Sequence, residues 1–505
     1  MNLLHELDQR LGSKTDLVVA ERLEDHVSEQ NPVRVIEAFV ESLDLARGGF
    51  RFPKDDPLGR GRPAYPPAAL LKLYLYGYLH GIRSSRRLEA KCRRNLEVLW
   101  LVQKLAPDFK TIADFRRDNR AAFKNLLREF TALCQGLELF GGELLAVDGI
   151  KLKAPNHPDR HTSQRKLRRQ LETLEQQIEG YLRALDEADA TEAGVAPPAP
   201  KALPTTAQVR EKLAALRQSQ AACRQQLDSL MATGQKQVSL TDPDSRAMSR
   251  GGVNVVGYNV QVVVDAKHKL LVESAATNAV NDLGQLAPMT LAAQAALAQA
   301  RVDVAARAPA AVARPQPPAA KVVADTGYYK SQDIKACQDA GVDPYVARSH
   351  NSQSEHQGLY GKSDFHYDAA ADTYRCPAGA TLKRRRTVDR GDKIEWEYGA
   401  PAACALCAQK RRCTPGRYRT LTRWEHEQRL ERMDERLACE PAVLAQRKAL
   451  VEHPLGTIKA RILAGGFLVR GLEKVGAEVS LAHWAYNFKR VVNIVGVPAL
   501  LAALG

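Results

Sequence analysis

Two apolar segments that each run into an aspartate constrain the fold of this chain more than any other feature. The first ends in Leu145-Ala146-Val147-Asp148 and the second in Val322-Val323-Ala324-Asp325. Short apolar runs that stop at a polar residue are typical of buried strands in a sheet covered by helices. Hairpin, helix and strand patterns alternate around them, which predicts an α/β core with a mixed sheet.

The expected elements of this core follow from residue type and from the turn-forming residues between them. β-branched residues on both sides of a Lys-His-Lys turn indicate a hairpin. An Ala/Pro-rich stretch, residues 305–320, is typical of a surface loop. The predicted elements are strand 143–148, hairpin strands Val253–Asp265 and Leu270–Thr277, a helix from Leu283 to about Ala300 opened by Asp282, helix Ser331–Ala340 and strand Val342–Ala347.

Changes in residue composition and hydrophobic pattern divide the chain into regions. Residues 1–140 have helical patterns, and residues 141–349 with 421–505 carry the core. Within the core, residues 156–236 contain two heptad-like leucine patterns on either side of a Pro-rich break, Pro197–Pro204, which predicts an inserted antiparallel helical hairpin. Residues 350–420 are polar, irregular and cysteine-containing, and are interpreted as a second insertion.

Charge favours a polyanionic partner. Lys and Arg number 73 against 58 Asp and Glu, a net charge of +15, and nucleic acid is the obvious candidate. In the helical region Pro66 and Pro67 open an apolar helix, Ser84 and Ser85 cap the next, and Thr111 caps a third that carries Arg116, Arg117 and Arg120. The second helix concentrates cations predicted to contact DNA, although a solvated basic face is the alternative: Arg83, Arg86, Arg87, Lys91, Arg93 and Arg94.

Localisation is predicted from what the sequence does not contain. No apolar run approaches the roughly 20 residues of a membrane-spanning helix, and Met1–Arg10 has no apolar signal segment. The nine cysteines then suit a reducing cytoplasm rather than a disulfide framework. We expect a cytoplasmic protein without a membrane partner.

A third acid, Glu452, follows after a long gap on a predicted helix. Acids at the ends of neighbouring parallel strands point into one crevice, and a helix across that edge can add a third carboxylate. Clustered carboxylates repel one another unless hard cations such as Mg²⁺ or Mn²⁺ neutralise them. A single acid is more commonly a helix cap or a surface carboxylate. The residues immediately around each acid therefore decide whether it is interpreted as a metal ligand.

Those contexts resemble the DDE transposases of bacterial insertion sequences. The matching motifs are Leu145–Gly149, Val322–Tyr329 and Val451–Lys459, supported by Thr241–Arg246, Gly257–Gln261, Val469–Leu472 and Tyr486–Arg490. The resemblance implies a ribonuclease H-like catalytic fold preceded by a helical DNA-binding domain. It also implies Asp148, Asp325 and Glu452 as ligands of Mg²⁺ or Mn²⁺, metal-dependent cleavage and strand transfer of double-stranded DNA at terminal inverted repeats and target, and a nucleoid-associated homodimer.

One departure from the family pattern concerns the helix of Glu452. The tyrosine and arginine usual seven and four residues upstream are replaced by Ala445 and Lys448, with Arg447 beside the latter. We expect Arg447, Lys448 and Lys459 to contact DNA, although lysine offers a point charge rather than a bidentate fork.

Four cysteines cluster between the second and third acids. Cys404 and Cys407 have zinc-knuckle spacing, Cys376 lies on a predicted turn, and Cys413 follows after a less regular gap. A structural Zn²⁺ is one interpretation, and four reduced cysteines in an insertion held by packing is the other.

Two other functions share this site. A DNA-binding protein derived from a transposase would hold DNA without cutting it, and intact Asp148, Asp325 and Glu452 disfavour it. A hydrolytic nuclease would use the same metals without passing a 3′-hydroxyl to target DNA, and only the resemblance separates it from a transposase.

Overall fold

The computed structural model describes residues 22–52, 64–156, 160–192, 206–250, 252–307, 320–348 and 357–505. The chain forms two compact units: a helical unit of Met1–Glu138, Ala460–Ala464 and Gly476–Gly505, and a sheet unit of Leu139–Lys459 and Gly465–Val475. Segments Met1–Arg10 and Pro197–Pro204, and residues 308–319 of the expected surface loop, lie outside the described residues.

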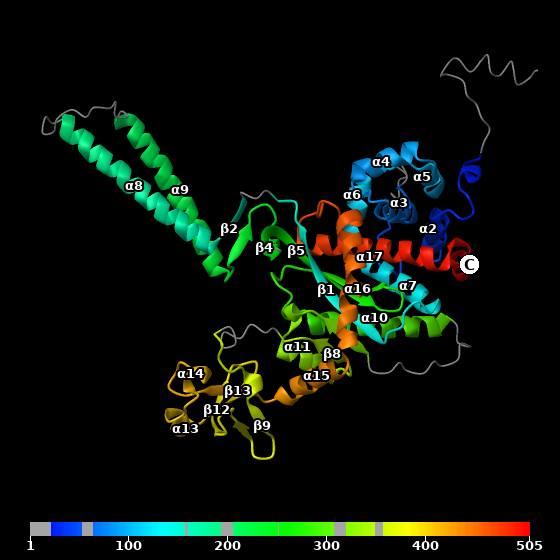
Figure 1. Cartoon of the computed structure of the whole chain (residues 1–505). Helices are drawn as coiled ribbons and strands as arrows, with labels where there is room; N and C mark the ends of the chain where they lie inside the picture. Colours follow the sequence, from blue (N-terminus) through cyan, green and yellow to red (C-terminus); the bar gives the residue numbers. More distant parts are fainter. Residues whose placement is uncertain are drawn as a thin grey trace, which may run out of the picture. The chain divides into compact units, whose positions relative to one another are not determined.

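The helical unit confirms the prediction of a helical N-terminal region (Figure 1). Pro67 at the first turn opens α3, whose residues are almost all buried; its apolar character on every side suits a central helix. The helices are η1 (Leu23–His26), α2 (Pro32–Glu41), α3 (Pro67–Leu79), α4 (Ser85–Arg94), α5 (Leu96–Leu101), α6 (Phe109–Asp118), α7 (Ala122–Gly136), α17 (Leu472–Val495) and α18 (Val497–Leu504).

The C-terminal residues complete this unit, which differs from the expectation that 421–505 belongs wholly to the α/β core. Trp484 of α17 stacks on Phe488 and Phe39, with ring centroids 4.6 and 6.3 Å apart. Glu478, fully buried, pairs with Arg83 at 3.6 Å and Arg116 at 3.3 Å. Burial of large aromatic rings and a buried ion triad join segments that are distant in sequence.

The N-caps of α4 and α6 differ slightly from those predicted from the sequence. Ser84 stands at the N-cap of α4 without a side-chain hydrogen bond. At α6 the cap is Asp108 rather than Thr111, because the Asp108 carboxylate accepts the backbone N–H groups of Lys110 and Thr111 at 2.8 and 3.0 Å. Thr111 therefore lies inside the first turn.

The sheet unit contains the predicted mixed sheet. Its order is β4-β5-β1-β7-β8, with β6 also paired to β5. β1, β7 and β8 are parallel, and β5 is antiparallel to β1, β4 and β6. The strands are β1 (Leu144–Lys153), β4 (Arg246–Arg250), β5 (Val253–Asp265), β6 (Leu271–Thr277), β7 (Lys321–Ala324) and β8 (Asp343–Val346).

β1 is longer than predicted and does not end at Asp148. Its parallel pairing with β7 stops at Ala146–Val323, but its antiparallel pairing with β5 continues to Lys153–Gly257. The strand persists because β5 supplies hydrogen-bond partners beyond the point where β7 ends. Asp148 therefore stands where β1 loses one of its two neighbours.

Helices α10 (Leu286–Arg307), α11 (Ser331–Asp339), α15 (Glu427–Cys439) and α16 (Pro441–Thr457) pack around this sheet, and α16 contacts β1, β5 and β7 (Figure 1). α16 continues into a π-helical turn, Ile458–Ile462. α10 starts four residues after Asp282, so Asp282 does not open it as expected.

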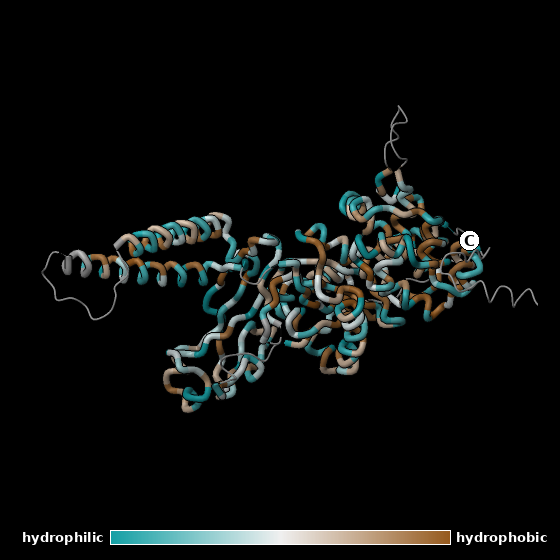
Figure 2. Tube along the Cα trace, turned by 90° about the horizontal axis from the view of Figure 1, so that it is seen from above, coloured by the Kyte–Doolittle hydropathy of each residue, from teal (hydrophilic) through white to brown (hydrophobic). Residues whose placement is uncertain are grey.

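The predicted helical hairpin is present as α8 (Gln164–Glu192) and α9 (Thr206–Ala232). Leu167, Leu171 and Leu174 of α8 pack with Cys223 and Leu230 of α9. Hydrophilic and hydrophobic stretches alternate along both helices in Figure 2, as expected when each helix buries one stripe. Short strands β2 (His161–Ser163) and β3 (Gln237–Ser239) pair at its base.

The cysteine-containing insertion is a folded β-module rather than an irregular segment, and it extends past residue 420. Its five-stranded antiparallel sheet has the order β13-β12-β11-β10-β9. Cross-strand pairs bury an aromatic core of Phe365, Tyr374 and Tyr398 with Leu382 and Leu421. The elements are η4 (Lys362–Asp364), β9 (His366–Asp368), β10 (Thr373–Arg375), β11 (Thr381–Asp389), β12 (Ile394–Gly399), α13 (Pro401–Ala405), α14 (Lys410–Cys413) and β13 (Thr420–Trp424).

Among the described residues, no single helix has the length and apolarity needed to cross a bilayer. α17 and α18 meet those criteria only as a pair, and they are bent by 108° at their junction.

Candidate active site at the carboxylates of the mixed sheet

Asp148 and Asp325 stand at the same level of neighbouring strands. Each lies two residues beyond the last parallel pair, Ala146–Val323, and adjacent strands are about 4.8 Å apart. Asp325 follows β7 directly and caps the 3₁₀ turn η3 (Thr326–Tyr328), where its carboxylate accepts the Gly327 N–H at 2.9 Å. The structure thus brings together two of the three predicted acids.

The Asp148 carboxylate is mostly buried and carries an unfavourable charge. Burial raises its pKa to about 6; the Gly149 N–H and Arg447 lower that pKa, while the negative charges of Asp325 and Asp282 raise it. Its Oδ1 accepts the Gly149 N–H at 2.8 Å and its Oδ2 accepts from Arg447 at 3.1 Å. The site therefore favours an additional positive charge near Asp148.

Asp282 is a third carboxylate at this site that sequence reasoning did not assign. Its Oδ1 accepts the side-chain amides of Asn259 and Gln261, both at 2.7 Å. Both amides come from fully buried residues of β5, so Asp282 is held by the sheet. The available signal was the Gly257–Gln261 motif, whose polar residues alternate within an otherwise apolar strand.

Tyr328 supports Asp282 through Gln261. It is fully buried and its hydroxyl donates to Gln261 Oε1. Burial raises its pKa far above the usual range, and the charges of Asp282, Asp148 and Asp325 raise it further. The phenol therefore stays protonated and orients Gln261, which in turn holds Asp282.

Gly149 allows this arrangement because no side chain fits beside Asp148. A Cβ at that position would lie 2.4 Å from Gln261 Nε2 and 3.0 Å from Asp282 Oδ1. Separations below about 3 Å are repulsive, so an alanine would displace the amide that holds Asp282. The Asp148–Gly149 pair in the sequence motif thus has a steric cause.

Glu452 lies on α16 but is directed differently from Arg447. Arg447 reaches Asp148, whereas Glu452 is exposed and pairs with Lys448 one turn earlier, at 3.6 Å. Five residues along an α-helix correspond to about 140° of rotation, which accounts for the divergence. Arg447, predicted to hold DNA, is thus a carboxylate partner here, and Lys448 and Lys459 are exposed.

The donor set fits a hard divalent cation in its chemistry. Asp148, Asp325 and Asp282 offer only oxygen ligands, which Mg²⁺ and Mn²⁺ prefer. In the described part of the chain, however, no three His, Cys, Asp or Glu side chains already form a metal-binding group. The convergence of Asp148, Asp325 and Glu452 on one metal site therefore stays a prediction.

The basic residues of α4 divide into two kinds. Arg83, just before the helix, is buried, donates to the Ala464 carbonyl at 2.7 Å and pairs with Glu478, so its predicted role in DNA contact is corrected to a structural one. The others remain accessible: Arg86 stacks on Phe109, Arg93 pairs with Glu89 at 3.2 Å, Lys91 is half-buried, and Arg87 and Arg94 are exposed.

The neighbouring arginines of α6 are similarly occupied. Arg116 pairs with buried Glu478, and Arg117 pairs with Asp114 and Asp118 at 2.6 and 2.7 Å. Within α4, by contrast, Arg87 and Arg94 are exposed.

The four clustered cysteines come together in the β9–β13 module. Cys376, Cys404, Cys407 and Cys413 all line one cavity. Of the other five cysteines, Cys92, Cys134, Cys223 and Cys337 are buried and Cys439 is exposed.

Comparison with known proteins assigns two segments. Residues 21–118 match the family described as Transposase domain (DUF772), and residues 375–492 match the family described as Transposase DDE domain. The second match contains Glu452 and the four cysteines; Asp148 and Asp325 precede it. No curated protein sequence matches the chain.

One solved structure is similar over most of the chain. It is the cryo-EM structure of a piggyBac transposase synaptic complex with hairpin DNA, which shares 8% identity at a TM-score of 0.29, covering 94% of this chain and 78% of that one. A likeness this low carries no conclusion about fold or activity.

Proposed function

The chain belongs to the DDE-type transposases through its two matched domains, and we propose that it cuts and rejoins double-stranded DNA at the ends of an insertion sequence, in a metal-dependent reaction. The observation that carries this proposal is the placement of Asp148 and Asp325 at the same level, each two residues beyond the last parallel pair of β1 and β7, Ala146–Val323. Two aspartates at that position are the first two acids expected of the family.

We further propose that the core is ribonuclease H-like. Three antiparallel strands, β6-β5-β1, continue into two parallel strands, β7 and β8, with helices packed against them. In this proposal Asp148 lies on the central strand β1, and Asp325 lies directly after its neighbour β7. The hairpin α8–α9 and the β9–β13 module are then insertions into a common core.

Asp148, Asp325 and Glu452 would hold Mg²⁺ or Mn²⁺, with Asp282 adding negative charge beside the first two. Two such ions, when bound, activate a water or 3′-hydroxyl and stabilise the leaving oxygen of a phosphodiester. Gln261, Asn259 and Tyr328 keep Asp282 in place through their hydrogen bonds. Arg447 balances the charge of Asp148. A cation bound at Asp148 would release the Arg447 guanidinium, which could then contact a DNA phosphate.

Double-stranded DNA is the proposed partner, in both terminal inverted repeats and target. The net charge of +15 and the exposed cations of α4 support binding through phosphates. A homodimer would place one active site at each of two DNA ends.

The test is a strand-transfer assay with the terminal repeats of the element that encodes the chain. We expect joined products with Mg²⁺ or Mn²⁺ and none with chelator. Asp148→Asn and Asp325→Asn should abolish joining while DNA binding persists; Asp339→Asn, an exposed carboxylate of α11 paired with Lys335, is the matched control.

The same assay separates the competing functions. Cleavage without any joined product would identify a hydrolytic nuclease. Binding to the repeats with neither cleavage nor joining, in either metal, would identify a DNA-binding protein that has lost catalysis.

A further inference from the structure

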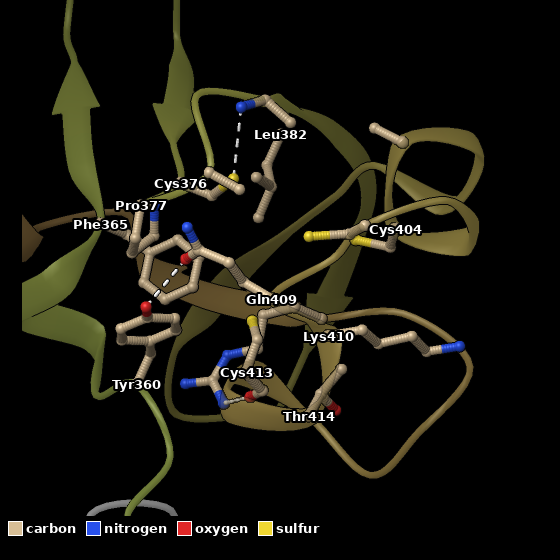
Figure 3. A pocket seen from close by; sticks show the side chains of 15 residues that line it. Tyr360, Phe365, Cys376, Pro377, Leu382, Cys404, Gln409, Lys410, Cys413 and Thr414 are labelled. Carbon is tan, nitrogen blue, oxygen red and sulfur yellow. Dashed lines mark hydrogen bonds between the residues drawn. The ribbon is translucent and has the colours of Figure 1, made fainter.

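Four cysteines of the β9–β13 module surround one cavity (Figure 3). They come from three segments: Cys376 from the turn after β10, Cys404 and Cys407 from α13 and the turn after it, and Cys413 from the end of α14. All four thiols are free and partly shielded from solvent. The fold therefore gathers soft ligands that the sequence separates by up to 37 residues, from 376 to 413.

The size of the cavity indicates what it can hold. Its volume is about 30 Å³, whereas pockets for organic ligands measure roughly 300–1,000 Å³. A buried water needs two to four polar partners, but apart from the sulfurs the exposed wall is almost wholly apolar, formed by residues such as Phe365 and Leu382. A single ion that prefers sulfur fits this space better than either.

We propose that Cys376, Cys404, Cys407 and Cys413 bind one structural Zn²⁺. Four thiolates match the tetrahedral, closed coordination of structural zinc sites. This site is separate from the carboxylates of the mixed sheet, and the proposal does not depend on the DNA chemistry proposed above.

The four cysteines line one cavity without being fixed in a ligand geometry. No three of them form a metal-binding group among the described residues, so binding requires side-chain rotations that draw the sulfurs inward. Burial raises the pKa of the Cys413 thiol; Arg419 lowers it, and Cys404, Cys376 and Cys407 raise it again.

The turn at Cys376 is already shaped for a thiolate ligand. The Ala380 N–H donates to Cys376 Sγ at 3.3 Å, the dashed line at Cys376 in Figure 3. The Gly379 N–H donates to the Cys376 carbonyl at 2.9 Å. Gly379 has a φ of +82°, which a side chain rarely permits. An amide directed at sulfur stabilises its charged form.

The connection between β12 and β13 has little packing to hold it in place. The aromatic core of the module lies among the strands, whereas this connection, residues 400–419, contains only the short helices α13 and α14. Leu406 in this connection is 92% exposed, so the segment buries little apolar surface. Zinc would tie this connection to the β10–β11 turn.

The experiment measures metal in the full-length protein, purified under reducing conditions. We expect about one zinc per chain in the wild type and in Cys439→Ser, which removes an exposed thiol outside the cluster. Cys407→Ser should hold less than about a fifth of that amount. Wild-type protein stripped by chelator should bind Co²⁺ at one equivalent, with the visible d–d bands of tetrahedral thiolate coordination.

Each outcome decides the proposal, even if Cys407→Ser fails to fold. Zinc retained in a folded Cys407→Ser would overturn the assignment of ligands. Wild-type protein without zinc that also gives no thiolate–Co²⁺ bands would overturn the site, leaving an insertion held only by packing. After chelation, hydrogen exchange should rise in residues 400–419 and stay unchanged in β11 and β12.

Discussion

The Arg447 guanidinium donates to Asp148 Oδ2 across 3.1 Å, joining two residues that lie 299 positions apart in the sequence. Both side chains are largely shielded, with exposed fractions of 23% and 19%. In this low-dielectric setting the guanidinium supplies the positive charge that the buried carboxylate needs. A divalent cation at Asp148 would compete with it.

Removal of that competitor should strengthen metal binding. Arg447→Gln is expected to bind Mn²⁺ about tenfold more tightly. In the wild type the metal must first break the charge-assisted hydrogen bond between Arg447 and Asp148, which contributes roughly 1.5–3 kcal/mol, and the variant lacks that cost. Isothermal titration of DNA-free protein measures the affinity. Arg432→Gln, an exposed arginine of α15, should leave it unchanged; weaker binding in Arg447→Gln would contradict competition.

Glu452 is the acid whose role depends most on the family resemblance. If it completes the metal site with DNA bound, Glu452→Gln should lower strand transfer by about 10³-fold, since metal-mediated charge stabilisation contributes several kcal/mol. DNA affinity should change less than about twofold. Glu435→Gln, on the exposed face of α15, is the control. A loss below tenfold would show that Glu452 only pairs with Lys448.

Asp282 should contribute to metal binding through its negative charge and to stability through its hydrogen bonds with two amides, and two substitutions separate these contributions. Asp282→Asn keeps a carbonyl acceptor for Asn259 and Gln261, so we expect a normal Tm but weaker Mn²⁺ binding. Asp282→Ala removes that acceptor. The Asn259 amide keeps only the Asn281 carbonyl at 3.5 Å, and loss of the acceptor for the buried Gln261 amide should cost about 1–3 kcal/mol. Thermal denaturation and metal titration of the two variants check this; equal metal affinity in Asp282→Asn and wild type would remove Asp282 from the site.

The cations around α4 should separate into DNA contacts and structural residues. Arg87→Gln combined with Arg94→Gln should lower the slope of log affinity against log salt by about one unit per lost phosphate contact. Arg183→Gln combined with Arg224→Gln, exposed on α8 and α9, controls for the same loss of two positive charges. An unchanged slope in the α4 double variant would make α4 a solvated basic face.

Arg83→Gln should behave differently from its neighbours in the same binding experiment. It removes one partner of the fully buried Glu478 and should destabilise the protein by up to about 3 kcal/mol, since Arg116 remains. Chemical denaturation measures the loss, and the salt slope of the remaining folded protein should equal that of wild type.

Glu427 gives a pH dependence with a defined sign. Burial alone raises its pKa, but Lys362, the Trp424 N–H and Arg348 outweigh burial and lower that pKa below the usual value. Its contribution to stability is therefore complete above the unfolded pKa of about 4.3 and is lost as pH falls through the lower folded pKa. Glu427→Gln should reduce Tm at pH 7 and approach wild type near pH 3. A difference that grows on acidification would contradict this sign.

The pattern of the sequence was sufficient for the mixed sheet and for the helical hairpin. Strands β5, β6, β7 and β8 and helix α11 lie within a few residues of their predicted bounds, because β-branched runs and leucine heptads report local burial. The β9–β13 module was missed because its core is aromatic and is assembled by cross-strand pairs, so its strands lack an aliphatic pattern.

The amino-acid sequence by itself determined the order of elements, the positions of Asp148 and Asp325 on neighbouring strands, and the grouping of four cysteines in one insertion. Only the tertiary structure decided that Arg447 faces Asp148 while Glu452 points elsewhere, that Asp282 joins the site, and that Arg83 is buried against Glu478. These are contacts between segments up to several hundred residues apart. Local periodicity specifies which face of an element is buried, but the partner across that face is set by packing of the whole fold.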